Sequence, residues 1–217
     1  MTVRRSVAGA AAIAALTMVA CAPKTPDYSS VLGTSSTTTT TTTTTKPVPL
    51  SQYLESIGVT GQQVAPGAVT DLTVSIPTPP GWSAFNDPKK VAPETLLISK
   101  GGKYPTARLV VFKLRGDFDP AQVIKHGNDD AQLFENFHQL DASMAPFNGF
   151  PSSMIQGSYD LESTRLHSWN RIVLPTGSPP ANQRYLVQLT ITSLADQAAA
   201  QSTDIDAIIH GFVVAAK

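Results

Sequence analysis

The sequence predicts an α+β fold in which helices cover the faces of a central antiparallel sheet of about six strands. Strand-like apolar patterns occur in two groups of three, and short connections within each group favour antiparallel pairing. Segments with helical spacing of apolar residues precede, separate and follow these groups. We therefore expect residues 50–217 to form a single globular α+β domain.

The strand predictions depend on local patterns of apolar residues. Residues 71–76 alternate between apolar and polar side chains, which predicts a strand with one buried face. Residues 108–114 contain a continuous apolar run, which predicts a central strand covered on both faces. The expected strands, in chain order, are residues 71–76, 96–99, 108–114, 153–161, 165–174 and 184–192.

Three helical regions are expected between and around these strands. The first begins near Ser51, its expected N-cap. The second has Asp119 as N-cap and Pro120 at its first helical position, breaks at Gly127 and resumes as far as Leu140. The third closes the chain and carries an apolar stripe that consists of Ile205, Ile208, Ile209 and Phe212.

The N-terminal segment resembles the signal of a bacterial lipoprotein. Arg4 and Arg5 precede an uncharged apolar run that is shorter than the roughly 20 residues of a membrane-spanning helix. The run ends in Met18-Val19-Ala20-Cys21, a lipobox with Met where Leu is usual. We expect residues 1–20 to be a signal peptide and Cys21 to carry acyl chains that anchor the mature protein. The alternative is a plain signal peptide, with Cys21 as an unmodified thiol.

Residues 21–49 are expected to be a disordered tether. They contain nine consecutive threonines, with serines before them and prolines after them, and lack apolar periodicity. This composition indicates an O-glycosylated stalk, and the alternative is an unmodified flexible tether. The candidate acceptors are Thr37, Thr38, Thr39, Thr40, Thr41, Thr42, Thr43, Thr44 and Thr45.

The rest of the sequence argues against several classes of function. Acidic and basic residues are equal in number and form no basic patch, so nucleic acid is not an expected partner. Gly157-Ser158 is not part of a nucleophile elbow, and Gly101-Gly102 lacks the pattern of a phosphate-binding loop. The four histidines do not have the spacing of metal ligands. We therefore expect no metal site, no cofactor and no enzymatic activity.

Acidic residues and aromatic residues supply the remaining candidates. Asp117, Asp119, Asp129 and Asp130 cluster, but capping accounts for Asp119 and the restart of the helix for Asp129. Aromatic residues in loops and on one polar strand face are the candidates for a ligand or partner surface. These residues are Trp82, Phe85, Phe147, Phe150 and Trp169. The alternative is that they close the rim of the core.

The order of these features resembles the LpqN/LpqT family of mycobacterial lipoproteins over essentially the whole chain. Ser51-Gln52-Tyr53-Leu54 follows the tether, and Thr73-Val74-Ser75-Ile76-Pro77-Thr78-Pro79-Pro80-Gly81-Trp82 comes next. Leu114-Arg115-Gly116-Asp117-Phe118-Asp119-Pro120-Ala121-Gln122-Val123-Ile124 completes the resemblance. It implies a Mog1/PsbP-like αβα sandwich and a protein lipid-anchored on the outer face of the plasma membrane or in the cell wall.

The sequence and the resemblance together lead us to expect a non-catalytic binding or adaptor module. Its membrane contact is the lipid anchor, and its partner is an envelope lipid or glycolipid, or a protein that exports such lipid. Exposure to a host is also implied by the resemblance. Two alternatives belong to other classes: a hydrolase of envelope material that uses the acids between 117 and 130, or His167 near Trp169, and a surface antigen that acts through its acyl anchor.

Overall fold

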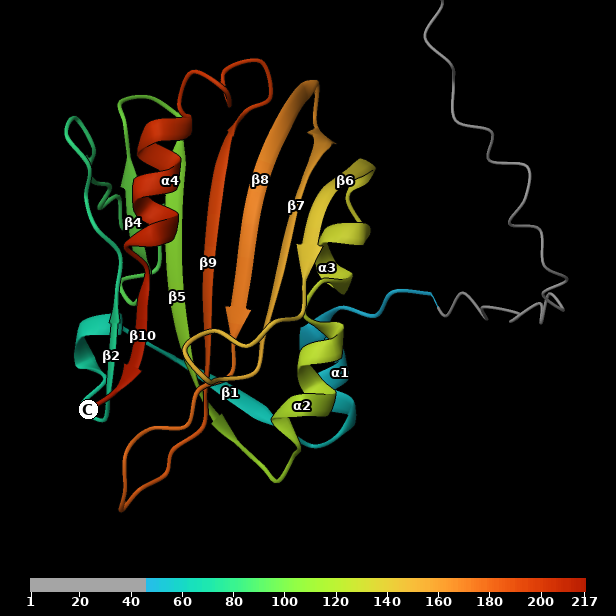
Figure 1. Ribbon diagram of the computed structural model, residues 1–217, viewed down its shortest axis with the longest axis vertical. Helices are drawn as coiled ribbons and strands as arrows, with labels where there is room; N and C mark the ends of the chain where they lie inside the picture. Colours follow the sequence, from blue (N-terminus) through green and yellow to red (C-terminus); the bar gives the residue numbers. More distant parts are fainter. Residues whose placement is uncertain (1–45) are drawn as a thin grey trace, which may run out of the picture. The chain divides into compact units, whose positions relative to one another are not determined.

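The computed structural model describes residues 46–217 (Figure 1). The expected signal peptide, Cys21 and the threonine run 37–45 lie outside the described residues. No helix in the described part is long and apolar enough to cross a membrane.

The domain is built around an eight-stranded antiparallel sheet. The strand order is β3-β4-β5-β9-β8-β7-β6, and β1 also pairs with β5. The strands are β1 (Thr60–Val64), β3 (Ser83–Ala84), β4 (Leu96–Ser99), β5 (Thr106–Arg115), β6 (Glu135–Ser143), β7 (Ser152–Leu161), β8 (Thr164–Val173) and β9 (Tyr185–Leu194). The predicted α+β class is confirmed, and five of the six predicted strands lie in this sheet.

The sixth predicted strand belongs to a separate two-stranded sheet. β2 (Leu72–Ser75) pairs with β10 (Val213–Ala216), so it does not join its sequence neighbours. Leu72 and Val74 are buried, as the alternating pattern predicted. The expectation that the chain closes with a helix was wrong, because β10 follows that helix. Four small or β-branched residues are too few to distinguish a strand from a frayed helix end.

The helices are short and mostly lie where the sequence predicted them. They are α1 (Leu50–Ser56), α2 (Pro120–Val123), α3 (Asp129–Gln132) and α4 (Ser202–His210), with 3₁₀ turns η1 (Pro66–Ala68) and η2 (Ile124–His126). Asp119 caps α2 by accepting a hydrogen bond from the Ala121 N–H at 2.9 Å. Ser51 is not an N-cap, because α1 begins one residue before it and Pro49 holds that position.

Residues 135–143 form a strand, although they were expected to continue a helix to Leu140. The helix α3 ends at Gln132, and β6 begins at Glu135 and pairs with β7, with Asn136 at a positive φ of 50°. A Cβ atom at Gly157 would lie 2.5 Å from the Phe137 ring, so glycine lets that ring lie across β7. The secondary structure of residues 135–143 is therefore determined by long-range pairing with β7 and not by the local spacing of apolar residues.

Two hydrophobic cores lie on opposite faces of the sheet. α4 and the β2–β10 sheet cover one face, called the α4 face, whereas α1, α2 and η2 cover the other, called the α1 face. The core of the α4 face includes Leu72, Trp82, Leu109, Val111, Val187, Ile191, Ile208 and Val214. The core of the α1 face includes Leu50, Leu54, Val59, Leu114, Val123, Ile172 and Leu186. All of these core residues follow Pro49.

Candidate functional site

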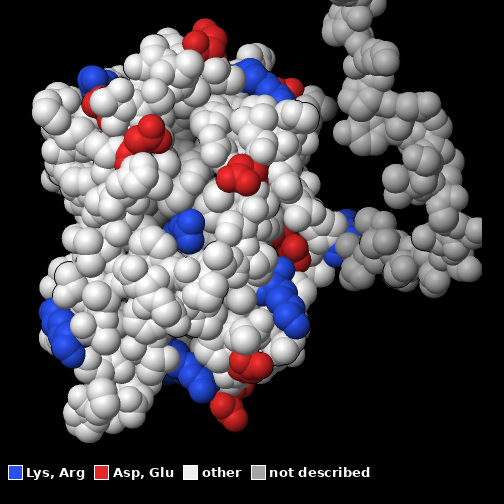
Figure 2. Space-filling view, in the orientation of Figure 1, with Lys and Arg blue, Asp and Glu red and all other residues white. Residues whose placement is uncertain are grey.

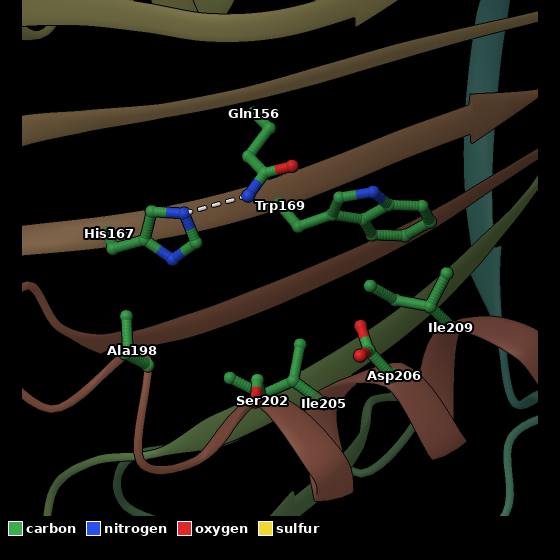
Figure 3. Close-up of a pocket in the computed structure, with 9 residues that line it drawn as sticks. Gln156, His167, Trp169, Ala198, Ser202, Ile205, Asp206 and Ile209 are labelled. Atoms are coloured by element: carbon green, nitrogen blue, oxygen red, sulfur yellow. Dashed lines mark hydrogen bonds between the residues drawn. The ribbon is translucent and has the colours of Figure 1, made fainter.

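A cleft of about 420 Å³ opens on the α4 face, between α4 and strands β7 and β8 (Figure 3). We call it the Trp169 cleft. Figure 1 shows α4 over one side of the sheet, with no helix in front of β7 and β8, and Figure 2 shows a hollow in this face. The side chains that define the cleft are Gln156, His167 and Trp169 from the sheet and Ile205, Asp206 and Ile209 from α4.

A hydrogen bond and burial both favour the neutral form of His167 in the Trp169 cleft. The amide Nε2 of Gln156 lies 3.0 Å from the imidazole Nε2 of His167, and an amide nitrogen can only donate. With the amide in this orientation the imidazole nitrogen accepts, which it can do only when it carries no proton. Burial also lowers the pKa of His167, because desolvation disfavours the charged ring.

Arg171 lies beside this cleft, two residues after Trp169 on the same face of β8. Its guanidinium carbon is 5.4 Å from the Trp169 ring centroid and 4.9 Å from the Phe147 ring centroid. The guanidinium Nη1 donates to the Ser152 hydroxyl oxygen at 3.1 Å. An arginine is thus held between two of the five predicted aromatic residues.

A larger space of about 590 Å³ lies on the α1 face, and we call it the α1 groove. Large apolar side chains from α1, β5, β8 and β9 form most of its wall: Leu50, Leu54, Phe112, Leu114, Ile172 and Leu186. Gly61 of β1 also lines it, and a Cβ atom there would lie 3.5 Å from the Leu114 side chain. A side chain at residue 61 would therefore point into the groove.

The apolar floor of the α1 groove gives way to polar side chains along β9. Leu186 is followed on the same strand face by Gln188, which lines the groove, and then by Thr190. The Gln188 amide donates to the Asn170 Oδ1 at 2.9 Å, and the Thr190 hydroxyl donates to the same oxygen at 2.8 Å. The groove thus combines a long apolar wall with a small hydrogen-bonded polar group at Gln188, and further polar side chains line it elsewhere: Ser51, Glu55, Thr60 and Asp130.

Of the five predicted aromatic residues, Trp169 lines the cleft, and the other four line neither of the two spaces. Trp82 is buried, and its indole N–H donates to the Asp204 carboxylate at 3.1 Å beside the first turn of α4. Phe85 is partly buried next to β4, where its N–H donates to Leu97 O at 2.8 Å. Phe150 packs against the core and exchanges backbone hydrogen bonds with Phe147. The structure therefore brings together Phe147 and Trp169, and the position of Trp82 matches the alternative interpretation as core.

The candidate acids each have a structural partner. Asp130 accepts a hydrogen bond from the Leu50 N–H at 3.0 Å, and Asp129 accepts one from His126 Nδ1 at 2.9 Å. Asp117 lies 3.7 Å from Arg184, and Asp119 caps α2. His167 is on the α4 face, so the fold does not bring it together with these acids. Within residues 46–217, no group of three or more His, Cys, Asp or Glu side chains could hold a metal ion.

Arg171 and the α1 groove are the features that sequence reasoning missed. The groove is lined from several separate segments, each of which shows only an ordinary core pattern. A signal for Arg171 was available, because Arg171 and His167 alternate with Trp169 and so share one face of the predicted strand. That signal cannot show whether the guanidinium has an acidic partner.

Comparisons with known proteins agree on one family. A family model described as "Probable lipoprotein LpqN" matches residues 46–215. The LpqT lipoprotein of Mycobacterium leprae is 70% identical, with 99% of each chain covered. LpqT of Mycobacterium tuberculosis is 63% identical, with 98% of this chain and 94% of that protein covered. The crystal structure of LpqN, described as involved in cell envelope biogenesis of Mycobacterium tuberculosis, covers 79% of this chain and 99% of its own, with TM-score 0.67 and 19% identity.

Proposed function

Because this chain belongs to the LpqN lipoprotein family, we propose that it is a non-catalytic, membrane-anchored module that binds an envelope lipid or glycolipid. The α1 groove carries the proposal, and we assign it to an apolar chain of that lipid. LpqN is described as involved in cell envelope biogenesis, and the proposal extends such a role to this chain.

The size and wall of the groove support an apolar chain as its occupant. Its volume of about 590 Å³ lies within the usual range of ligand sites, roughly 300–1,000 Å³. Each methylene transferred from water to such a wall contributes about 0.8 kcal/mol, so ten would contribute on the order of 8 kcal/mol before the cost of ordering the chain. A small polar metabolite would leave most of this wall without a matching surface.

The polar end of the groove suits the hydroxyl groups of a sugar or glycerol headgroup. Gln188 presents an amide oxygen and an amide nitrogen, and its bond to Asn170 fixes its orientation. In the family setting, the chain is expected to be exported and fixed to the outer face of the plasma membrane through Cys21. From that position the domain can receive lipid from the membrane or from a protein that exports it.

The structure gives no specific support to the hydrolase alternative. Asp119, Asp129 and Asp130 all accept hydrogen bonds that fasten backbone segments or a side chain. The hydroxyl and carboxyl groups in the described part of the chain form no set in which a nucleophile contacts a base and the base contacts an acid. We therefore assign no catalytic role to these residues.

Native mass spectrometry of the soluble chain from Ala22, incubated with envelope lipid extract, tests the proposal. We expect retained lipid with the unsubstituted chain and loss of that lipid in Gly61→Phe, whose ring would fill the groove. Gly67→Phe is the matched control, because nothing lies within 4 Å of a Cβ atom at Gly67. Equal retention by both variants, or no lipid on the unsubstituted chain, would overturn the proposal.

A further inference from the structure

Arg171 is a partly buried cation that forms no ion pair in the described part of the chain. Of its five N–H donors, the Nη1 group reaches Ser152, whereas the Nε group is buried and has no partner. Its backbone neighbours across the sheet are the buried Leu189 and Met154. Removing a guanidinium from water over an apolar floor is unfavourable without an anion.

The surroundings of Arg171 hold the guanidinium in place. Ser152, which accepts from Arg171, donates its own hydroxyl proton to the Ala145 carbonyl at 2.8 Å. Phe147 stacks on Phe212 with ring centroids 5.2 Å apart, so the loop that carries it is fixed to the end of α4. The guanidinium is therefore positioned before any ligand arrives, which lowers the entropy lost on binding.

Arg184 provides a comparison within the same chain. Its guanidinium carbon also lies near an aromatic ring, 4.8 Å from the Phe118 centroid. Unlike Arg171, it has an acidic partner in Asp117 and also donates to the Phe118 carbonyl. An arginine near an aromatic ring in this fold can therefore have an acidic partner. Of these two arginines, only Arg171 lacks one among the described residues.

The Trp169 cleft adds a space next to this charge that is lined partly by apolar side chains and partly by Gln156, His167 and Asp206. Trp169 lines the cleft together with Ile205 and Ile209 (Figure 3). The indole of Trp169 also has the Arg171 guanidinium carbon 5.4 Å from its ring centroid. We propose that Arg171 binds the carboxylate or phosphate group of a single-chain anionic amphiphile whose apolar part lies in the Trp169 cleft. This site is separate from the α1 groove, because the two lie on opposite faces of the sheet.

The geometry and charge of the site favour this ligand class. A carboxylate or phosphate accepts two parallel N–H bonds from a guanidinium, which a hydroxyl cannot do. Burial lowers the pKa of Arg171, as expected for a cation without a partner, and the group stays protonated at neutral pH. An anion at this position would supply the missing counter-charge.

Titration of the soluble chain with dodecanoate, followed by tryptophan fluorescence, tests the proposal. Gly61→Phe serves as the background so that the α1 groove does not contribute. We expect dodecanoate to bind more tightly than dodecanol, and Arg171→Gln to weaken dodecanoate about ten- to a hundredfold without changing dodecanol. Arg184→Gln, the matched control, should leave dodecanoate binding unchanged.

Two results would overturn the proposal. A further comparison keeps it testable if Arg171→Gln does not fold. Equal affinity for dodecanoate and dodecanol would exclude a role for the charge. If inorganic phosphate bound as tightly as dodecanoate, the apolar chain of the ligand would contribute nothing to binding. If Arg171→Gln fails to fold, the comparison of dodecanoate with dodecanol on the Gly61→Phe chain decides alone, and Arg171→Lys should retain part of the preference for the acid.

Discussion

The carboxylate of Asp130 accepts a hydrogen bond from the backbone N–H of Leu50 at 3.0 Å, across 80 residues of sequence. Leu50 is the first residue of α1, where the N–H groups have no partner within the helix. The first turn of the helix that closes the α1 groove is therefore fastened to α3. Both residues also line the groove, so this bond connects the stability of α1 with the shape of the proposed lipid site.

Asp130→Ala should loosen α1. The substitution removes a charge-assisted hydrogen bond, so we expect a loss of about 1–3 kcal/mol in the free energy of unfolding, measured by urea denaturation. Hydrogen exchange should accelerate in α1 more than in β9. Asp117→Ala is the matched control, because the Asp117 side chain is fully exposed, and it should change the free energy of unfolding by less than about 0.5 kcal/mol. Equal losses in the two variants would contradict this role of Asp130.

Acidification should weaken the domain through His167. Its pKa in the folded state lies below the unfolded value of 6.5, so the unfolded chain binds the proton more readily. Stability from neutral His167 is fully present above pH 6.5 and is lost as the pH falls through the folded pKa. The protonated ring would also lose its bond from Gln156, because both nitrogens would then be donors.

Thermal unfolding of the unsubstituted chain and of His167→Gln between pH 7.5 and pH 5 measures this effect. The unsubstituted chain should lose more stability over this range than the variant, which has no group that titrates at this position. His210→Gln is a suitable control, since His210 lies at the exposed C-terminal end of α4. Parallel curves for the unsubstituted chain and His167→Gln would show that His167 does not carry the pH dependence.

Gly157→Ala should displace the edge strand β6. The added methyl group would lie 2.5 Å from the Phe137 ring and 2.7 Å from the His138 carbonyl oxygen, which is backbone and cannot rotate away. We expect a loss of about 1–3 kcal/mol in stability and faster hydrogen exchange in β6 than in β8. Gly67→Ala, with nothing near its added methyl group, should leave both quantities unchanged. Unaltered exchange in β6 would contradict the tight packing of Phe137 on β7.

Cys21→Ala should release the protein from the membrane. Acyl chains on this cysteine are the proposed anchor, and the tether offers no apolar segment to replace them. Fractionation of cells that express each form should place the unsubstituted protein with membranes and the variant in a soluble fraction. The anchoring proposal is wrong if the variant remains membrane-bound after a high-salt wash.

Local patterns were sufficient for most of the fold. The alternation at 71–76 and the apolar run within 108–114 depend on residues close in sequence, and both segments are strands. Asp119 could be identified as a cap because its partner, Ala121, is two residues away. The segment 135–143 was misread because its helical spacing is local, whereas the pairing with β7 that determines its structure is not.

The candidate sites were less predictable than the fold, for the same physical reason. Trp169 and Phe147 were identified as individual aromatic residues, but only the fold places Arg171 between them. The wall of the α1 groove joins residues from Leu50 to Leu186, and no short segment contains a sign of it. A space between elements depends on how the elements meet, which their separate sequences do not specify.

Strand β8 presents Trp169 and Arg171 to the α4 face and Asn170 and Ile172 to the α1 face, because successive residues of a strand point in opposite directions. The two proposed ligands would therefore be separated by the thickness of one sheet and would share the backbone of one strand. If occupancy of one site shifts β8, the affinity of the other must change, and thermodynamic linkage makes the effect equal in both directions. If both proposed sites exist and are coupled in this way, the arrival of one ligand would change how readily the other is released.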